Sequence, residues 1–202
     1  MARVFVITGP SGVGKGTLIR GLRQRMPDLD LSVSATTRSP RPGERDGVDY
    51  HFLSPQEFRR RVEAGDFVEH ATYSGSSYGT LRSELERRLE AGVPVVLEIE
   101  VQGARQVRQA MPESLAVFIA PPTHEALRAR LVGRGTDAEE QIEQRMQTAE
   151  RELRARPEFA HVVVNDRLEE ATAQLEQIVR GALAEDPPPA ANLKVPDQGF
   201  NP

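Results

Sequence analysis

The sequence has no cysteine, and only two of its 26 basic residues are lysine. A small secreted scaffold would normally use disulfides, so the absence of cysteine favours a cytoplasmic protein. No apolar run reaches membrane-spanning length, and the run at the N-terminus is too short for a signal peptide. We therefore expect a cytoplasmic location and no membrane partner.

An excess of positive charge is also lacking, because the formal net charge of the 202 residues is -4. A general nucleic-acid binder usually carries a basic face, so nucleic acid is not an expected partner. Any anionic ligand must then be held by local clusters of basic residues. The length suits one domain of moderate size that buries its own core.

Short apolar runs alternate with helical patterns along most of the chain. The expected buried strands are Arg3–Thr8, Val93–Val101, Leu115–Ala120 and His161–Asn165. The expected helices are Gly14–Met26, Gln102–Met111, Thr123–Leu131, Asp137–Arg156 and Leu168–Leu183. Continuous apolar strands alternating with helices predict an α/β fold, in which helices cover both faces of a parallel sheet.

Two segments depart from this alternation. Between Leu31 and Tyr78 the runs are shorter and half-polar, which indicates a small β-rich insertion. Within it, Ser54 is an expected helix N-cap, with Pro55 in the first turn and Glu57 closing a capping box. From Glu185 onward, clustered prolines without apolar periodicity predict a flexible tail.

The segment Phe5–Leu18, FVITGPSGVGKGTL, places a glycine-rich loop between an expected strand and an expected helix. Glycines let backbone N–H groups converge on one anion, and a lysine in the pattern Gly9-x-x-x-x-Gly14-Lys15 reaches the outer phosphates of a nucleotide. In a chain whose basic residues are nearly all arginine, a lysine at this position supports a phosphate loop. The alternative is a glycine-rich turn without a ligand. The expected ATP-binding residues of the loop are Gly9, Pro10, Ser11, Gly12, Val13, Gly14, Lys15, Gly16 and Thr17.

Gly16 stands where such loops usually have a serine or threonine whose hydroxyl contacts Mg²⁺. Thr17 follows one place late and lies about 100° further round the helix, so it does not replace that hydroxyl automatically. Phosphates and water can hold Mg²⁺, because the ion keeps part of its hydration shell. We therefore expect Mg²⁺ to bind with ATP and without a certain protein ligand.

Several further segments resemble guanylate kinases in their order and spacing. They are GPSGVGKGTL, SVSATTRSPRPGERDGVDYHF, EIEVQG, FIAPP, RLVGRGT and VVVND, and the resemblance runs from about Arg3 to Leu183. It implies a P-loop kinase that transfers the γ-phosphoryl group of ATP directly to GMP, and also to dGMP, giving ADP and GDP.

The resemblance also implies a GMP site. Arg38, Arg41, Tyr50 and Tyr78 are assigned to the phosphate of GMP, and two guanidinium forks suit a dianionic group. Ser34, Glu69, Thr80 and Glu100 are assigned to the base. A carboxylate can accept from N1–H and the 2-amino group of guanine, whereas adenine has no such pair of donors. Taken singly, each of these residues also fits an ordinary strand, cap or solvated position.

An arginine-rich helical segment resembles the lid of the family. The resemblance assigns Arg130, Arg134 and Arg145 to the ATP phosphates together with Lys15, and it makes Asn165 the adenine contact. An equally open interpretation of Asn165 is a polar residue that begins a turn. For Glu150 with Arg154 and Glu152 with Arg156, the spacing predicts solvated ion pairs on a helix surface.

One departure from the family lies in the segment Glu98-Ile99-Glu100, where aspartates are frequent. The extra methylene moves each carboxylate by roughly 1.5 Å, so Glu98, like Thr17, is an expected outer-shell contact of the metal. Both carboxylates follow a parallel strand and should face the ligand crevice.

These inferences divide the chain into a kinase domain at 1–184 and a tail at 185–202. Within the domain we expect a core at 1–31, 80–125 and 157–184, a GMP-binding insertion at 32–79 and a lid at 126–156. Two alternatives stay open, a kinase for ribose 1,5-bisphosphate and a non-catalytic binding module. Nothing in the sequence indicates the oligomeric state.

Overall fold

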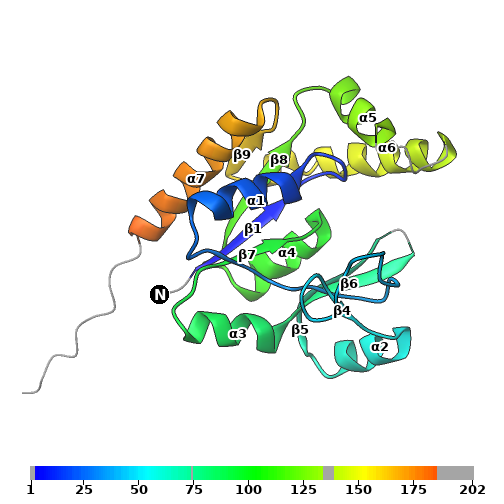
Figure 1. Ribbon diagram of the computed structural model, residues 1–202, viewed down its shortest axis with the longest axis vertical. Helices are drawn as coiled ribbons and strands as arrows, with labels where there is room; N and C mark the ends of the chain where they lie inside the picture. The colour runs from blue at the N-terminus through cyan, green and yellow to red at the C-terminus, as the bar shows by residue number, and fades with distance from the viewer. Residues whose placement is uncertain (1–2, 74, 134–138, 186–202) are drawn as a thin grey trace, which may run out of the picture.

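A computed structural model describes residues 3–73, 75–133 and 139–185, and its centre is a five-stranded parallel sheet (Figure 1). The strand order is β2-β7-β1-β8-β9. The strands are β1 (Val4–Thr8), β2 (Asp30–Leu31), β7 (Val95–Glu98), β8 (Leu115–Ala120) and β9 (His161–Val164). The helices that follow them are α1 (Lys15–Arg25), α3 (Arg82–Glu90), α4 (Val101–Ala110), α5 (His124–Val132), α6 (Glu139–Leu153) and α7 (Leu168–Glu185). The predicted α/β fold is confirmed.

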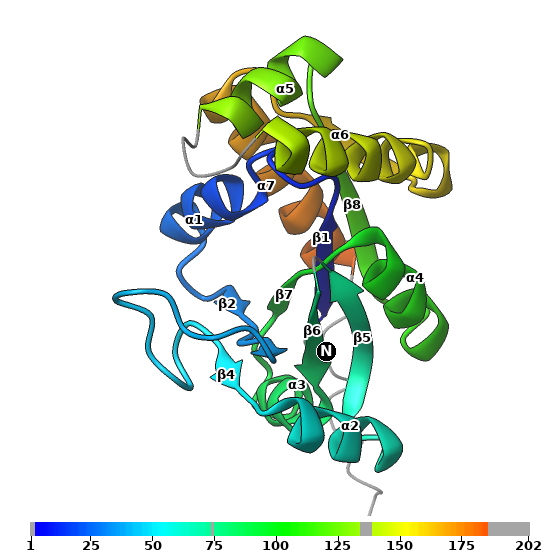
Figure 2. The ribbon, with the colours of Figure 1, turned by 90° about the vertical axis from the view of Figure 1, so that its right-hand side faces the viewer.

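Helices cover both faces of this sheet, because alternate residues of each strand carry apolar side chains to opposite sides. On one face, Phe5 and Ile7 of β1 pack with α1 and α7, and on the other, Val4 and Val6 pack with α3 and α4. Figure 2 shows α1 and α7 on one side of β1 and α4 on the other. The inner strands are thus buried on both faces, as continuous apolar runs predict.

A second, four-stranded sheet lies beside the carboxyl ends of the first, in the order β4-β3-β6-β5. Its elements are β3 (Ala35–Thr36), β4 (His51–Phe52), β5 (Phe67–Tyr73) and β6 (Ser76–Leu81), with α2 (Pro55–Glu63) packed on it. Phe58 of α2 stacks on Phe67 of β5 with ring centroids 4.6 Å apart. This aromatic pair and the aliphatic side chains around it, Ala35 and Leu81, form a small separate core.

The predicted N-cap of α2 is confirmed, since the Ser54 hydroxyl accepts the Glu57 N–H at 3.1 Å. The second half of the predicted capping box is wrong. The Glu57 carboxylate accepts instead from Arg60 and Arg61 at 2.8 Å. These ion pairs lower its pKa to about 2. Two guanidinium groups outcompete one backbone N–H for the same carboxylate.

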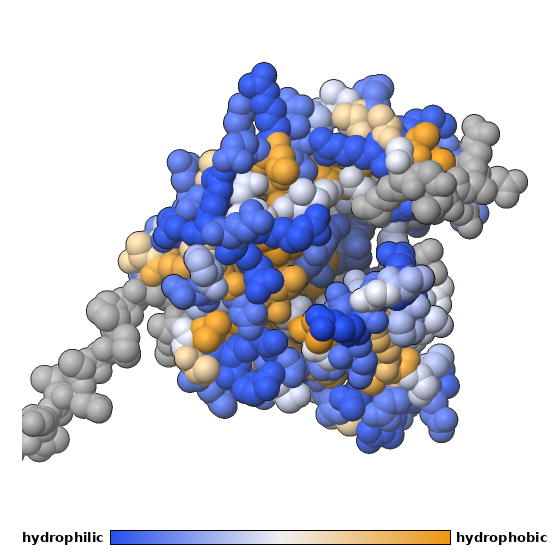
Figure 3. Space-filling view, viewed as in Figure 1, coloured by the Kyte–Doolittle hydropathy of each residue, from blue (hydrophilic) through white to orange (hydrophobic). Residues whose placement is uncertain are grey.

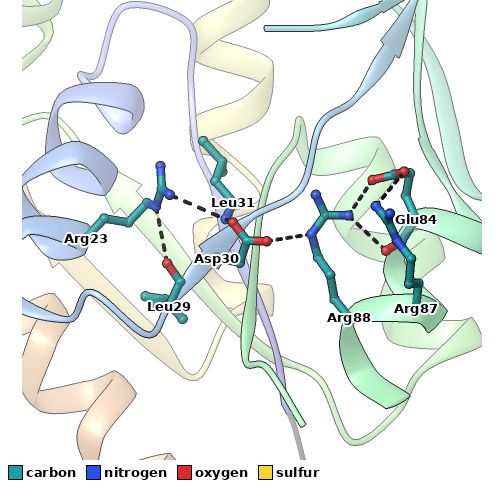
Figure 4. Close-up of polar contacts among 7 residues, drawn as sticks. All are labelled: Arg23, Leu29, Asp30, Leu31, Glu84, Arg87 and Arg88. Carbon is teal, nitrogen blue, oxygen red and sulfur yellow. Dashed lines mark hydrogen bonds and ion pairs between the residues drawn. The ribbon is translucent and has the colours of Figure 1, made fainter. Parts of the chain in front are cut away.

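A chain of ion pairs joins α1, β2 and α3 (Figure 4). Asp30 of β2 accepts from Arg88 Nε at 2.6 Å and lies 3.8 Å from Arg23 of α1. Arg88 also pairs with Glu84 one turn earlier in α3. Because β2 precedes the second sheet and α3 follows it, these contacts tie together the two points where the chain leaves and rejoins the main sheet.

Several elements differ from the sequence prediction, among them the helix predicted at Asp137–Arg156, which ends at Leu153. The strand predicted at Val93–Val101 ends at Glu98, because α4 begins at Val101. Neither β2 nor α3 was predicted, and α7 includes Glu185, the residue at which the tail was expected to begin. The rest of the predicted tail, 186–202, lies outside the described residues. In the part of the chain that the structure describes, no helix is long and apolar enough to cross a membrane.

Candidate active site

A cleft of about 1510 Å³ lies between the second sheet, the start of α4 and the helix α6. Figure 3 shows the surface hollowed between the upper part of the molecule and the second sheet below it. Polar side chains from all three elements line the cleft, among them Arg38, Arg41, Tyr78, Glu100, Gln102, Arg145, Arg151 and Glu152. It brings together residues far apart in sequence.

The glycine-rich loop connects the carboxyl end of β1 with the N-terminus of α1, as predicted. Gly9, Gly12 and Gly14 have φ angles of 138°, 84° and 97°, which side-chain-bearing residues rarely adopt. Lys15 is 8% exposed, and its ammonium donates to the carbonyls of Gly9 at 2.6 Å and Pro10 at 3.4 Å. The lysine is thus held against its own loop, with its charge available to an incoming anion.

Two predicted site residues, Asn165 and Arg130, form hydrogen bonds with the backbone of this loop. The Asn165 amide is buried and donates to the Val13 carbonyl at 2.8 Å. Arg130 donates to the Val13 carbonyl at 3.2 Å and to the Asn165 carbonyl at 2.8 Å. A Cβ on Gly14 would lie 2.6 Å from the Asn165 amide nitrogen. Both side chains therefore brace the loop in this structure.

A third predicted residue, Arg145 of α6, also contacts the phosphate loop. Its guanidinium donates to the Ser11 hydroxyl at 2.9 Å, and its side chain lines the cleft. Arg134 lies outside the described residues. Two of the three predicted lid arginines thus contact the phosphate loop directly.

The predicted acceptor-phosphate residues gather on the second sheet. Arg38 pairs with Glu44 at 2.8 Å and lies 5.2 Å from the centre of the Tyr50 ring. Glu44 raises the pKa of Arg38, chiefly through this hydrogen bond. The rings of Tyr50 and Tyr78 meet edge to face at 6.3 Å. Arg41, whose backbone N–H is also held by Glu44, opens onto the same cleft.

The predicted base-recognition residues are more deeply placed. Glu69 is 3% exposed and accepts from the Thr80 hydroxyl at 2.8 Å. Burial raises its pKa to about 7, although the Thr80 hydrogen bonds oppose the shift. A Cβ on Gly103 would lie 2.4 Å from Glu69 Oε2, so only glycine leaves room for this carboxyl against α4. Ser34 is half-buried beside β3, where its carbonyl accepts the His51 N–H.

Glu98 lies at the carboxyl end of β7, next to the phosphate loop. A Cβ built on Gly16 would lie 3.4 Å from Glu98 Oε2 and 3.5 Å from Oε1, so this carboxylate lies directly beside Gly16 at van der Waals distance. Shielding from bulk water raises the pKa of Glu98, while Lys15 opposes the shift. The Thr17 hydroxyl accepts from Arg20 at 3.1 Å and is already engaged.

Glu152 is a cleft residue that the sequence analysis assigned to a solvated ion pair with Arg156. That prediction is wrong, because Arg156 begins a short 3₁₀ turn after α6, while the Glu152 carboxyl lines the cleft. The spacing of Arg145, Ala149 and Glu152 on one helical face was the signal that could have revealed it. Among the described residues, no cluster of three or more acidic or histidine side chains could hold a metal ion.

Comparisons with known proteins agree on one family. The family model described as guanylate kinase matches residues 1–182. A guanylate kinase of Frankia casuarinae is 54% identical over 177 residues, covering 88% of this chain and 96% of that protein. A guanylate kinase of Mycobacterium leprae is 50% identical and covers 90% of this chain and 88% of its own length.

A solved structure agrees as well. The crystal structure of guanylate kinase from Anaplasma phagocytophilum matches with a TM-score of 0.72 and 31% identity, over 89% of this chain and 85% of that one.

Proposed function

The chain belongs to the guanylate kinase family, and from that membership we propose how its residues carry out the reaction. It is an ATP:GMP phosphotransferase, which moves the γ-phosphoryl group of ATP to GMP and yields ADP and GDP. We propose that the transfer is direct and in line, and that dGMP is also accepted. A terminal phosphate oxygen of the acceptor is ionised near pH 7, so no general base is needed.

On the donor side, the residues of the phosphate loop bind the ATP phosphates. Backbone N–H groups between Gly9 and Thr17 and the N-terminus of α1 favour negative charge there. The Lys15 ammonium turns from the loop carbonyls to the β- and γ-phosphates and stabilises the charge that moves during transfer. Arg145 and Arg134 add charge from the lid, while Arg130 and Asn165 keep the loop in shape.

On the acceptor side, Arg38 and Arg41 bind the phosphate of GMP, assisted by the hydroxyls of Tyr50 and Tyr78. Glu69 accepts from the guanine N1–H and 2-amino group, with Ser34, Thr80 and Glu100 completing the base contacts. A buried carboxyl that loses a specific partner is left unsatisfied, which makes this kind of recognition selective. These roles rest on the family resemblance and on the geometry of the cleft wall.

Mg²⁺ accompanies ATP in this proposal, and the residues present fit it. The Glu98 carboxylate lies beside position 16, 3.4 Å from where a Cβ on Gly16 would stand, and such hard oxygen ligands suit Mg²⁺, directly or through water. When bound with ATP, the ion would supply positive charge that offsets the charge of the transferred group. The Thr17 hydroxyl, which accepts from Arg20, keeps a second lone pair and its own O–H, so Thr17 is a second outer-shell candidate.

The observation that carries the proposal is a single cleft shared by both halves of the reaction. Arg38 and Arg41 line it from the second sheet and Arg145 from α6, while Glu100 of its wall lies 3.9 Å from the Lys15 ammonium. Donor and acceptor phosphates could therefore meet with positive charge on both sides. We further propose that the enzyme acts in the cytoplasm on free nucleotides, without nucleic acid.

The test is a coupled assay with ATP and a panel of GMP, dGMP, AMP, UMP and ribose 1,5-bisphosphate. We expect phosphorylation of GMP and dGMP only, and a loss of most turnover in a folded Lys15→Met variant. A higher rate with ribose 1,5-bisphosphate than with GMP would show that the substrate is the ribose bisphosphate. Failure of the wild-type chain to bind ATP in calorimetry would favour a binding module.

A further inference from the structure

A side chain of α4 pairs with the outer edge of β5, which is the edge strand of the second sheet. The Gln106 amide nitrogen donates to the His70 carbonyl at 2.7 Å, and the Gln106 amide oxygen accepts the His70 N–H at 3.1 Å. A primary amide carries a donor and an acceptor side by side, so it satisfies both backbone groups of one residue as a neighbouring strand would. Helix α4, which lies beside β5 (Figure 2), is thus joined to that strand by two directional contacts.

This contact adjoins the carboxyl group that we propose binds guanine. Glu69 directly precedes His70 in β5, and Gly103 lies one turn before Gln106 on the same face of α4. A Cβ on Gly103 would collide with the Glu69 carboxyl group. The place of that carboxyl group in the cleft wall therefore depends on how closely, and at which height, β5 lies against α4.

The local shape of β5 makes Glu69 depend on contacts outside its own sheet. The register of β5 with β6 shifts between Phe67 and Glu69, and such a bulge bends the strand and redirects its side chains. Phe67 packs in the small core of the second sheet, whereas Val68 belongs to a buried apolar cluster that includes Ala104 of α4. Apolar packing has no preferred direction, so the hydrogen bonds of Gln106 are the contacts that fix the position of β5 along α4.

We propose that Gln106 is a positioning residue for the recognition of guanine. By holding the His70 backbone, it keeps the Glu69 carboxyl group against Gly103, where it accepts from the N1–H and the 2-amino group of the base. The inference rests on the proposed function, in which Glu69 binds guanine. The hydrogen bonds described for the phosphate loop come from α1, α5, α6 and the residue after β9, so loss of the Gln106 contact should affect GMP and not ATP.

The test compares the wild type with Gln106→Met, which keeps nearly the same side-chain length and removes both hydrogen bonds. The control is Gln109→Met, the same substitution at an exposed position of the same helix. We expect Gln106→Met to raise the KM for GMP about tenfold and to leave the KM for ATP within about twofold of the wild type. Gln109→Met should leave both KM values unchanged.

A comparison of GMP with inosine monophosphate separates this role from a merely structural one. Inosine monophosphate keeps the N1–H and lacks the 2-amino group, so the ratio of kcat/KM for GMP to that for inosine monophosphate measures how well Glu69 reaches the amino group. A displaced Glu69 lowers this ratio, and we expect a fall of about fivefold or more in Gln106→Met. A general loss of stability would leave the ratio at its wild-type value.

A double-mutant cycle with Glu69→Ala shows whether Gln106 acts through Glu69. In Glu69→Ala no carboxyl group is left to position, so adding Gln106→Met should change kcat/KM for GMP by less than about twofold. Thermal unfolding of every variant accompanies the kinetics. If Gln106→Met does not fold, Gln106→Asn replaces it, because its amide is one methylene too short to keep both hydrogen bonds. If Glu69→Ala does not fold, the ratio of the two acceptors decides.

Four results would overturn the inference. They are a wild-type KM for GMP in folded Gln106→Met, an equal change in the KM for ATP or in Gln109→Met, an unchanged ratio of GMP to inosine monophosphate, and a full effect of Gln106→Met in the Glu69→Ala chain. If the wild type did not phosphorylate GMP, the proposed function would fail instead. The Kd values of the two nucleotides, measured by calorimetry, would then test the contact, because an unchanged Kd ratio in Gln106→Met would show that Gln106 does not position Glu69.

Discussion

Glu69 is a single residue whose state of charge bears on the binding of GMP. Its carboxyl group is buried beneath α4, accepts only from Thr80 and has a pKa of about 7. The fold therefore favours the neutral form. The stability that neutral Glu69 contributes is fully present below pH 4.5, the ordinary pKa of a glutamate. It is lost as the pH rises through the pKa of about 7 in the folded chain. Guanine, which offers two donors, favours the ionised form instead.

GMP binding should accordingly release a proton from Glu69. At pH 6.5 we expect roughly half to one proton released per GMP, measured by calorimetry in buffers of different ionisation enthalpy. Glu69→Gln, which cannot ionise, should release only the smaller fraction that comes from the GMP phosphate, whose second pKa is about 6, and should raise the KM for GMP far more than that for ATP. Equal proton release by the two chains would show that the base does not meet Glu69.

Gly16 is the second residue with a testable role. The Glu98 carboxylate lies beside it, 3.4 Å from where a Cβ at this position would stand. A serine hydroxyl at this position would donate to Glu98 and would not be free for the metal. We expect Gly16→Ser to change the Mg²⁺ dependence of turnover and Mn²⁺ binding to the ATP complex, followed by electron paramagnetic resonance, by less than about threefold. Gly16→Ala is the matched control, and a tenfold gain in affinity by serine alone would contradict this assignment.

At the scale of elements, the second sheet is tied to the main sheet where the chain leaves and rejoins it. Asp30, Arg88 and Glu84 join β2 to α3. Arg88 is 15% exposed and Glu84 19%, so water screens these pairs less than those on the open surface. Partial burial pushes the pKa of Asp30 up, but its hydrogen bond with Arg88 and neighbouring charges lower it overall.

Asp30→Asn should therefore lower the free energy of unfolding by about 1 kcal/mol at pH 7. Because the pKa of Asp30 is lowered in the folded chain, its contribution is present above the ordinary value of 3.8 and is lost as the pH falls further. Urea unfolding at pH 7 and at low pH measures the difference. Glu170→Gln, which breaks an exposed pair with Arg167, is the control and should have little effect. A larger loss of unfolding free energy in Glu170→Gln than in Asp30→Asn would contradict the stabilising role of the Asp30 ion pairs.

For the whole molecule, two sheets with separate cores face one cleft, so each substrate should stabilise the chain independently. At about 100 times its Kd, a ligand adds about 2.7 kcal/mol, which raises Tm by roughly 5–10 °C for a domain of this size. We expect such shifts with GMP and with a non-hydrolysable ATP analogue, and none with UMP. Lys15→Met should keep the Tm shift caused by GMP and lose most of the Tm shift caused by the ATP analogue. A UMP shift equal to that of GMP would argue against guanine recognition.

The sequence by itself determined the order of the main strands and helices and the identity of the phosphate loop. Those features are local, because apolar runs, glycines that permit positive φ and a lysine at fixed spacing act within a few residues. The helix Arg82–Glu90 escaped prediction since only two of its residues are apolar. Its helical state depends on Leu85 packing against a sheet that the local pattern does not reveal.

Tertiary structure alone decided which side chains share the cleft and in what state of charge. Glu152 has the spacing of a surface ion pair, yet it lines the same cleft as Glu100, which lies 52 positions earlier in the chain. The sequence pattern of Glu69 is that of an exposed strand carboxylate. In the structure α4 covers it, with Gly103 next to the carboxyl group. Burial and the distance between charges set a pKa, and both arise only when distant segments meet.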